Sequence, residues 1–311
     1  MIKIKNFIGY YYHLYPVEII RSSKTYKFYM NTMTYLLYLV SDFQGEINEQ
    51  VLLNKALEKN NFHSTIIINC FGKAYSLIEG KWYVLVMYNF INRRICIDDL
   101  ANIGNNYLKD GNYRNLDRSN WYILWCKKID YFEYQKSYIR NKYPLLYNTI
   151  DYFIGYAEIA ISYLNEINRK IKKNMLDNLV ICHKRLYINS ELFDFYNPFS
   201  LILDYKARDI GEYLKSLFFY GYNDEQVKKI LLICNSSYQR HLVMARVMFP
   251  SFYFDCYENI INGVVTENEI LPILDKIKDY EDFLLYLYNL LKETDFLIRI
   301  DFLEKSNFYH H

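Results

Sequence analysis

The chain has 311 residues and a mass of 37.8 kDa, the size of one large domain or two small ones. Hydrophobic residues make up 52% of it and charged residues 23%, with only 10 Gly and 5 Pro, which excludes a disordered, collagen-like or linker-dominated chain. Lys and Arg number 37 against 35 Asp and Glu, and the resulting net charge of +2 gives no overall electrostatic attraction to nucleic acid or to an anionic membrane.

The N-terminus and the cysteines indicate a cytosolic globular protein. The first residues contain no continuous apolar stretch followed by a small-residue cleavage site, and no apolar run approaches the length of about 18 residues that a membrane span needs. The cysteines are widely spaced, without a CxxC motif or a zinc-ligand pattern, so we expect buried thiols in a reducing compartment. They are Cys70, Cys96, Cys126, Cys182, Cys234 and Cys256.

Residues 1–90 are predicted to form a β-rich N-terminal lobe. Runs of β-branched and aromatic residues predict strands at 25–30, 34–40, 64–69 and 81–88. Between the second and third runs, residues 45–60 place apolar side chains at helical spacing. The predicted order is therefore strand, strand, helix, strand, strand.

Residues 91–311 are predicted to form a mainly helical lobe. Asp98 is placed to cap a helix that carries Leu100, Ile103, Tyr107 and Leu108. Further helices are expected over residues 150–173, 210–218 and 227–234, from Ser237 to a stop before Pro250, and after a capping box at 266–269.

One segment interrupts the helical lobe. Residues 178–182 predict a short buried strand, and residues 191–195 and 199–203 predict a β-hairpin that turns at 196–198 and ends at Asp204. The fold class is then α+β, with a β-rich lobe followed by a helical lobe that contains an embedded hairpin. Protein kinases and small-molecule phosphotransferases have this layout.

In those enzymes the loop after the buried strand carries His-x-Asp and then an Asn, and the following hairpin ends in a metal-binding Asp. The corresponding residues here are His183, Arg185, Asn189 and Asp204. Arg185 occupies the position of the general base, and a guanidinium cannot accept a proton from a substrate hydroxyl. Asn189 stands one residue closer to His183 than the usual spacing of a second metal ligand.

The N-terminal lobe departs from the pattern as well. The first turn, at residues 21–24, is not glycine-rich, and the strand at 33–40 contains no lysine to bind phosphate. Lys24 and Lys27 are the candidates to replace that lysine. The sequence thus lacks the base, the phosphate loop and the usual ammonium group, each of which positions or stabilises transferring phosphate.

Several longer segments resemble one family in particular. Residues 153–164, 180–185, 204–213 and 244–256, together with a Tyr-x-x-Tyr-Pro stretch at 12–16, are similar in this order to the spore-coat-associated YutH branch of the CotS-like family. The Cys-His-x-Arg and Asp-x-x-x-Arg-Asp motifs of that family match residues here, and Leu186 stands where the family usually has Phe. The matching residues are Cys182, His183, Arg185, Asp204, Arg208 and Asp209.

The resemblance implies an aminoglycoside-phosphotransferase-like fold and a sporulation role in an endospore-forming bacterium. We therefore expect a kinase-like pseudoenzyme without catalytic residues, made in the cytoplasm and deposited on the spore coat as a structural or assembly protein. Other spore coat proteins are the expected partners, with no nucleic acid, no resident metal and no required cofactor. The alternatives are an atypical small-molecule phosphotransferase using ATP and Mg²⁺, with Asp204 and Asn189 as metal ligands, and a nucleotide-binding scaffold without turnover.

The individual residues also have structural explanations. His183 is expected to pack and hydrogen-bond within its loop, and Asp204 to bind a metal or to pair with Arg185 or Arg208. Arg208 is expected to hold the loop through a carboxylate, and Asp209 to cap the helix that follows it.

Aromatic residues leave two readings open. The 35 tyrosines reflect either an AT-rich genome or a tyrosine-rich surface for partner binding or oxidative cross-linking, with clusters at 10–12 and at Tyr286 and Tyr288. Trp121 and Trp125 are expected to be packing residues, or else an exposed ridge for a partner.

Overall fold

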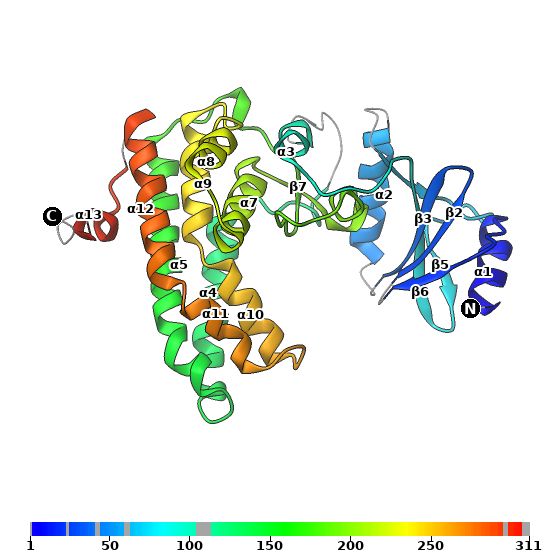
Figure 1. The fold of residues 1–311 in the computed structure, drawn as a ribbon, viewed down its shortest axis with the longest axis horizontal. Helices are drawn as coiled ribbons and strands as arrows, with labels where there is room; N and C mark the ends of the chain where they lie inside the picture. Colours follow the sequence, from blue (N-terminus) through cyan, green and yellow to red (C-terminus); the bar gives the residue numbers. More distant parts are fainter. Residues whose placement is uncertain are drawn as a thin grey trace. The chain divides into compact units, whose positions relative to one another are not determined.

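The structure is a computed structural model that describes residues 2–22, 25–40, 44–58, 63–103, 113–294 and 298–306 (Figure 1). By its internal contacts the chain divides into two compact units. The first comprises Met1–Asp117 and Asn189–Leu203, and the second comprises Arg118–Ile188 and Asp204–His311. Residues 91–117 and 189–203 therefore belong with the β-rich part of the chain, although the sequence placed them in the helical lobe.

An antiparallel sheet forms the centre of the first unit. Its strand order is β1-β2-β3-β6-β4, and β5 pairs with part of β6. The four strands and the helix predicted here are confirmed, and β1 and β5 are additional. The elements are β1 (Ile20–Ser22), β2 (Thr25–Met30), β3 (Met33–Val40), α2 (Gln44–Glu58), β4 (Ser64–Ile67), β5 (Ser76–Ile78) and β6 (Lys81–Tyr88).

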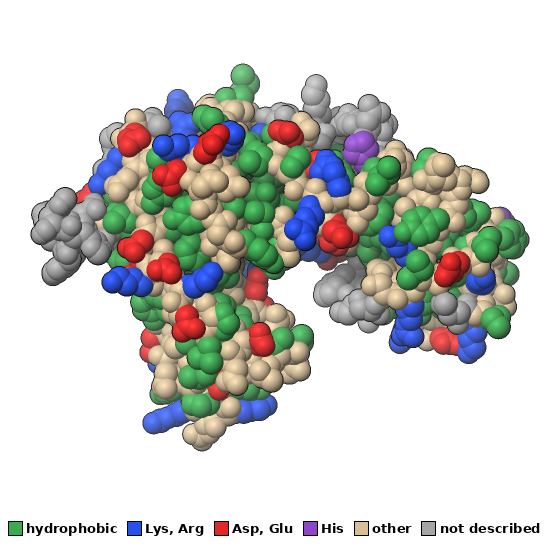
Figure 2. Space-filling model, in the orientation of Figure 1, with side chains coloured by type: hydrophobic (Ala, Val, Ile, Leu, Met, Phe, Trp, Pro, Cys, Tyr) green, Lys and Arg blue, Asp and Glu red, His purple; other side chains and the backbone are tan. Residues whose placement is uncertain are grey.

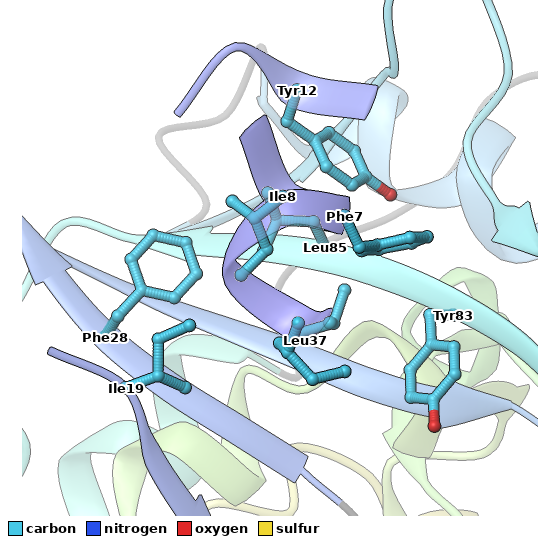
Figure 3. Packing of buried hydrophobic residues seen from close by; sticks show 9 residues of the cluster. Phe7, Ile8, Tyr12, Ile19, Phe28, Leu37, Tyr83 and Leu85 are labelled. Carbon is cyan, nitrogen blue, oxygen red and sulfur yellow. The ribbon is translucent and has the colours of Figure 1, made fainter. Parts of the chain in front are cut away.

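Both faces of this sheet carry buried apolar side chains. Successive residues of a strand point to opposite sides, so neighbouring residues enter different clusters. Leu37 and Leu85 point into a cluster that α1 (Ile2–Tyr12) covers (Figure 3). Leu36 belongs to a second cluster, against which Val51 of α2 packs. Figure 1 shows α1 and α2 on opposite sides of the sheet.

Helix α1 corrects the expectation that residues 1–90 hold strands with a single helix. Apolar and basic residues alternate at positions 2–5, as they do in a half-buried strand. Nevertheless, this segment is helical, and Ile4, Phe7, Ile8 and Tyr12 are buried together on one face of the helix. The hydroxyl of Tyr12 lies 3.2 Å from the Oγ of Ser76, which ties the end of the helix to the sheet.

Asn54 of α2 provides hydrogen-bond partners for backbone groups on the free edge of strand β4. Its Nδ2 donates to the carbonyl of Ser64 at 3.0 Å, and its Oδ1 accepts from the backbone nitrogen of Ile66 at 2.8 Å. The buried amide therefore takes the place of a neighbouring strand.

Residues 189–203 do not form the predicted hairpin. They form α6 (Leu192–Phe195), the 3₁₀ turn η2 (Pro198–Ser200) and then β8 (Leu201–Asp204). The backbone nitrogen of Tyr196 donates to the carbonyl of Leu192 at 2.8 Å, closing a helical turn over residues that the pattern assigned to a strand. A short apolar run cannot be assigned to helix or strand by periodicity alone.

A further helix of the first unit, α3 (Ile97–Ile103), begins as predicted near Asp98. The neighbouring Asp99, however, is the residue whose carboxylate accepts from the backbone nitrogen of Cys96, at 2.8 Å, and from Arg93. Tyr107 and Leu108, which were expected on this helix, lie outside the described residues.

The second unit is mainly helical, as predicted. The helices expected over 150–173, 210–218, 227–234 and 237–249 are confirmed as α5, α7, α8 and α9, and the strand expected at 178–182 is β7; α4 was not predicted. The elements are α4 (Trp121–Ile139), α5 (Pro144–Lys170), η1 (Met175–Asp177), β7 (Val180–His183), α7 (Ala207–Tyr220), α8 (Asp224–Leu231), α9 (Ser237–Met248), α10 (Ser251–Ile261), η3 (Glu267–Ile270), α11 (Leu271–Leu274), α12 (Ile277–Thr294) and α13 (Asp301–Ser306).

The predicted capping box at residues 266–269 is wrong. Thr266 precedes the 3₁₀ helix η3, but its side chain makes no capping bond. The carboxylate of Glu267 instead accepts from the backbone nitrogen of Leu146 at 3.0 Å. That bond caps α5, whose own N-cap residue Tyr143 supplies no side-chain cap.

The surface carries charges of both signs. In Figure 2, acidic and basic side chains lie interspersed on the visible face of the second unit. No helix among the described residues combines the length and apolar character needed to cross a membrane. Cys182 and Cys234 are buried as expected, whereas Cys70 and Cys96 are exposed, contrary to the expectation for all six.

Candidate functional site

The loop that follows β7 is held by the first turn of α7. His183 is buried, and both its backbone nitrogen and its ring contact the carboxylate of Asp209, at 2.9 Å to Oδ1 and 2.6 Å from Nδ1 to Oδ2. The N-cap residue of α7 is Lys206. Asp209 therefore fixes the orientation of the imidazole, where the sequence suggested a cap for its own helix.

Arg208 joins the same loop to the end of β8. Its Nε donates to the carbonyl of His183 at 2.8 Å, and its Nη2 donates to the carbonyl of Lys184 at 2.9 Å. Its Nη1 donates to Oδ2 of Asp204 at 2.8 Å. The planar guanidinium presents several donors in a fixed geometry, which suits it to hold two chain segments together.

Asp204, the candidate metal ligand, is fully buried and surrounded by donors. The indole nitrogen of Trp121 lies 2.8 Å from Oδ1 and 3.0 Å from Oδ2. Oδ1 also accepts from the backbone nitrogen of Tyr205 at 2.7 Å, and Oδ2 accepts from Arg208. Burial raises the pKa of this carboxyl, while the positive charge of Arg208 acts to lower it.

Arg185, at the position of the base, forms a forked ion pair with Asp255. Its Nε and Nη2 each lie 2.5 Å from one carboxylate oxygen of Asp255. Burial alone would lower the pKa of Arg185, but its hydrogen bonds to Asp255 and the nearby carboxylates raise that pKa above its ordinary value. The side chain is therefore positively charged at any physiological pH, and it cannot accept a proton.

A second ionic cluster lies between α7 and α9. One oxygen of Glu212 contacts both the ammonium of Lys215, at 2.8 Å, and the Nε of Arg246, at 2.7 Å. Lys215 also donates to the Oγ of Ser251 at 2.5 Å. All three charged side chains are buried. We call Glu212, Lys215 and Arg246 the buried triad.

The electrostatics of the buried triad follow from burial and from pairing. Burial would raise the pKa of Glu212, yet Lys215 and Arg246 hold it well below its usual range. Burial lowers the pKa of Lys215 to about 7 and that of Arg246 to about 10. The guanidinium of Arg246 also lies over the ring of Trp121, 5.4 Å from its centroid.

The structure places the remaining candidates as follows. Asn189 is an exposed residue of the first unit. Lys27, on β2 of the same unit, has its ammonium 4.8 Å from the ring centroid of Phe193, and Lys24 lies outside the described residues. Trp121 and Trp125 are buried and stacked, with centroids 5.3 Å apart, so they do not form the exposed ridge that was considered.

Several residues of this region had no signal in the sequence. Asp255 and Trp121 lie 70 and 83 positions from the residues they bind, and no motif links them. Glu212 and Lys215 stand among the apolar positions that identified α7, where charged residues are normally assigned to the solvent face. Among the residues that the structure describes, no group of three or more His, Cys, Asp or Glu side chains is arranged to hold a metal ion.

Three comparisons identify relatives of the chain. The sequence profile of the family described as "Spore coat putative kinase YutH" matches residues 5–286. The endospore coat-associated protein YutH of Bacillus subtilis (strain 168) is 24% identical, and the alignment covers 98% of this chain and 99% of that protein.

Two solved structures with a similar fold are described as a phosphotransferase and a kinase. An aminoglycoside phosphotransferase from Alicyclobacillus acidocaldarius superposes with a TM-score of 0.66 at 10% identity, covering 89% of this chain and 93% of that one. The amicoumacin kinase hAmiN, solved with AMP-PNP and Ca²⁺, gives a TM-score of 0.55 at 13% identity, covering 90% and 92%. These likenesses confirm the predicted kinase-like fold. The chain belongs to the spore coat YutH family and carries that fold.

Proposed function

We propose that this protein is a kinase-like pseudoenzyme that acts as a structural or assembly component of the spore coat. It would be made in the cytoplasm and deposited on the coat, with other coat proteins as its partners. The observation that carries the proposal is the forked ion pair between Arg185 and Asp255 at the position of the general base. Family membership supplies the association with the coat.

Loss of the base removes one essential part of phosphoryl transfer. A kinase-like site needs a group that accepts the proton of the attacking hydroxyl or positions that hydroxyl. Arg185 cannot accept that proton, because its guanidinium has only donors, and two of them are bound to Asp255. A replacement base would have to come from another residue.

Asp204, which corresponds to the metal ligand of kinases, also supports the assignment as a pseudoenzyme. Both oxygens of Asp204 already accept hydrogen bonds from nitrogen donors, and the side chain is closed to solvent. A Mg²⁺ ion would require Asp204 to leave Trp121 or Arg208, and the freed donor would lose its partner in a buried environment. As they are arranged, these residues do not fit a Mg²⁺ site, and we derive no step through one.

Nucleotide binding without turnover is the second candidate. The observation that favours it is the fold, since the similar amicoumacin kinase was solved with AMP-PNP. A scaffold of this kind would bind ATP in the absence of the catalytic base. An atypical phosphotransferase that uses Asp204 and Asn189 would in addition require the metal.

Thermal unfolding with and without ~1 mM ATP, in Mg²⁺ and in EDTA, separates these functions. A ligand with a dissociation constant of about 10 μM would stabilise the protein by about 2.7 kcal/mol, a shift of roughly 2–4 °C. We expect no shift for the pseudoenzyme. A shift in EDTA and in Mg²⁺ alike would indicate the scaffold, and a shift that requires Mg²⁺, followed by phosphoryl transfer, would overturn the proposal.

The coat role is tested in sporulating cells. A fluorescent fusion of the full chain, expressed in an endospore-forming host that lacks its own relative, should collect around the developing spore. The same fusion in vegetative cells is the matched control. A fusion that stays diffuse throughout sporulation would contradict deposition on the coat.

A further inference from the structure

The exposed face of α4 carries two tyrosines in direct contact. Tyr134 and Tyr138 are one helical turn apart, and their hydroxyl oxygens lie 2.9 Å from each other. Their ring centroids are 5.2 Å apart, with the planes tilted by 52°. Each residue is 64% exposed, so packing in the core does not explain the contact. The two phenols form an accessible pair on the surface of the second unit.

We propose that Tyr134 and Tyr138 are a site of oxidative coupling, at which a peroxide-driven peroxidase joins the two rings within one chain. Each phenol loses one electron and one proton to become a phenoxyl radical. The two radicals join through a bond between the ring carbons next to the hydroxyls. The proton on each of these carbons then moves to the oxygen of the same ring, which restores the hydroxyl and the aromatic ring. Two tyrosines and one hydrogen peroxide give one dityrosine and two waters.

The contact between the hydroxyls is the observation that selects this product. Because the new bond forms between carbons adjacent to the two hydroxyls, the hydroxyls of a dityrosine lie side by side. Tyr134 and Tyr138 already have this arrangement, on a helix that fixes the distance between their backbones. Their hydrogen bond also raises the pKa of Tyr138. Little rearrangement separates the contact from the coupled state.

Among the residues that the structure describes, two other tyrosine pairs each lack one of the two requirements. Tyr38 and Tyr88 also bring their hydroxyls together, at 2.7 Å, but Tyr88 is fully buried and closed to an oxidising enzyme. Tyr152 and Tyr156 have ring centroids 5.1 Å apart, but both hydroxyls are directed to the carboxylate of Glu281. Access and hydroxyl contact coincide at Tyr134 and Tyr138.

The sequence around the pair makes the product directly measurable. Trypsin cleaves after Lys128, Lys136 and Arg140, so Tyr134 and Tyr138 fall on two neighbouring peptides. Coupling joins the two peptides into one species that is lighter than their sum by two hydrogen atoms. The purified full chain is treated with horseradish peroxidase and limiting hydrogen peroxide, and the monomer band from a denaturing gel is digested and analysed by mass spectrometry.

We expect the joined peptides in the wild-type monomer, and we expect them to be absent in Tyr134→Phe and in Tyr138→Phe. Tyr131→Phe and Tyr122→Phe, at other exposed positions of the same helix, should keep them. Circular dichroism of all four variants checks that α4 still forms. Coupling that survives Tyr134→Phe, or that appears only in cross-linked dimers while the monomer band stays unmodified, would overturn the proposal.

Discussion

The apolar cluster around Leu37 in the first unit and the buried triad in the second each hold neighbouring elements together. The first does so through apolar packing and the second through paired charges. Around Leu37, aliphatic and aromatic side chains from α1 and the sheet pack against one another through apolar contacts. Between α7 and α9, Glu212, Lys215 and Arg246 are equally buried, but each charge is held by another. The first arrangement depends on volume, and the second depends on keeping every charge paired.

The largest loss of stability is expected when one charge of the buried triad is removed and the shape of the side chain is kept. Glu212→Gln keeps the volume but leaves the ammonium of Lys215 and the guanidinium of Arg246 without their carboxylate. Breaking a buried pair in this way costs about 3–5 kcal/mol, and chemical denaturation of the purified protein measures it. We expect a loss of that size.

The matched control is a shape-preserving change in the apolar core. Leu37→Met, at a fully buried position, should cost less than about 1.5 kcal/mol, because the volume is retained and no charge is exposed. Equal losses in the two variants would show that the charges of the triad contribute no more than their packing.

A smaller effect tests how closely α7 and α9 approach. A Cβ atom added at Gly211 would lie 2.7 Å from Cγ of Arg246 and 2.8 Å from its Cβ, so Gly211→Ala must displace Arg246 from Glu212. Overpacking of this kind costs about 1–3 kcal/mol, which a shift of the denaturation midpoint would report.

Gly155, inside α5, is the opposite case, because nothing lies within 4 Å of an added Cβ. Gly155→Ala should therefore stabilise the protein by about 0.5–1 kcal/mol through helix propensity. If both substitutions stabilise, the close approach at Gly211 is not a constraint on the fold.

The pH dependence of stability tests the protonation of one member of the buried triad, Lys215. Burial lowers the pKa of Lys215 to about 7 from its ordinary 10.5, so between these values the unfolded chain binds more protons than the folded one. The free energy of unfolding should therefore rise with pH above about 7, by at most about 1.4 kcal/mol per pH unit. Lys215→Met should remove this rise.

The measurement is a series of denaturation curves from pH 7 to 9. Burial raises the pKa of the Cys182 thiol and of Tyr253, so above their ordinary values of 9.0 and 10.0 these groups act in the opposite sense. Lys229→Met, on the exposed surface of α8, is the control and should keep the rise. A rise that persists unchanged in Lys215→Met would assign it to other groups.

The sequence predicted the elements whose pattern is long and regular. The strands at 25–30 and 81–88 follow from runs of β-branched and aromatic residues, and helix α5 follows from apolar residues at helical spacing. The end of α9 follows from Pro250. Helix α1 was missed because its first residues alternate as a strand does, although Ile4, Phe7 and Ile8 already had helical spacing. The turn at α6 was missed because a segment of four or five residues with three apolar side chains fits either helix or strand.

The candidate site was predicted only in its local part. His183, Arg208 and Asp209 stand in recognisable motifs, and the structure places all three around one loop. The partners that determine their surroundings come from distant segments, as Asp255 and Trp121 do. Pairing between such residues depends on how helices pack, and a single sequence carries no signal of that packing.

The amide of Asn54 has a consequence for the behaviour of the protein at high concentration. An open strand edge is a template on which another chain can add a strand and begin aggregation. At Ser64 and Ile66 the groups that such a strand would need are already occupied by Asn54. Molecules crowded together would therefore be kept from joining through this edge of the sheet.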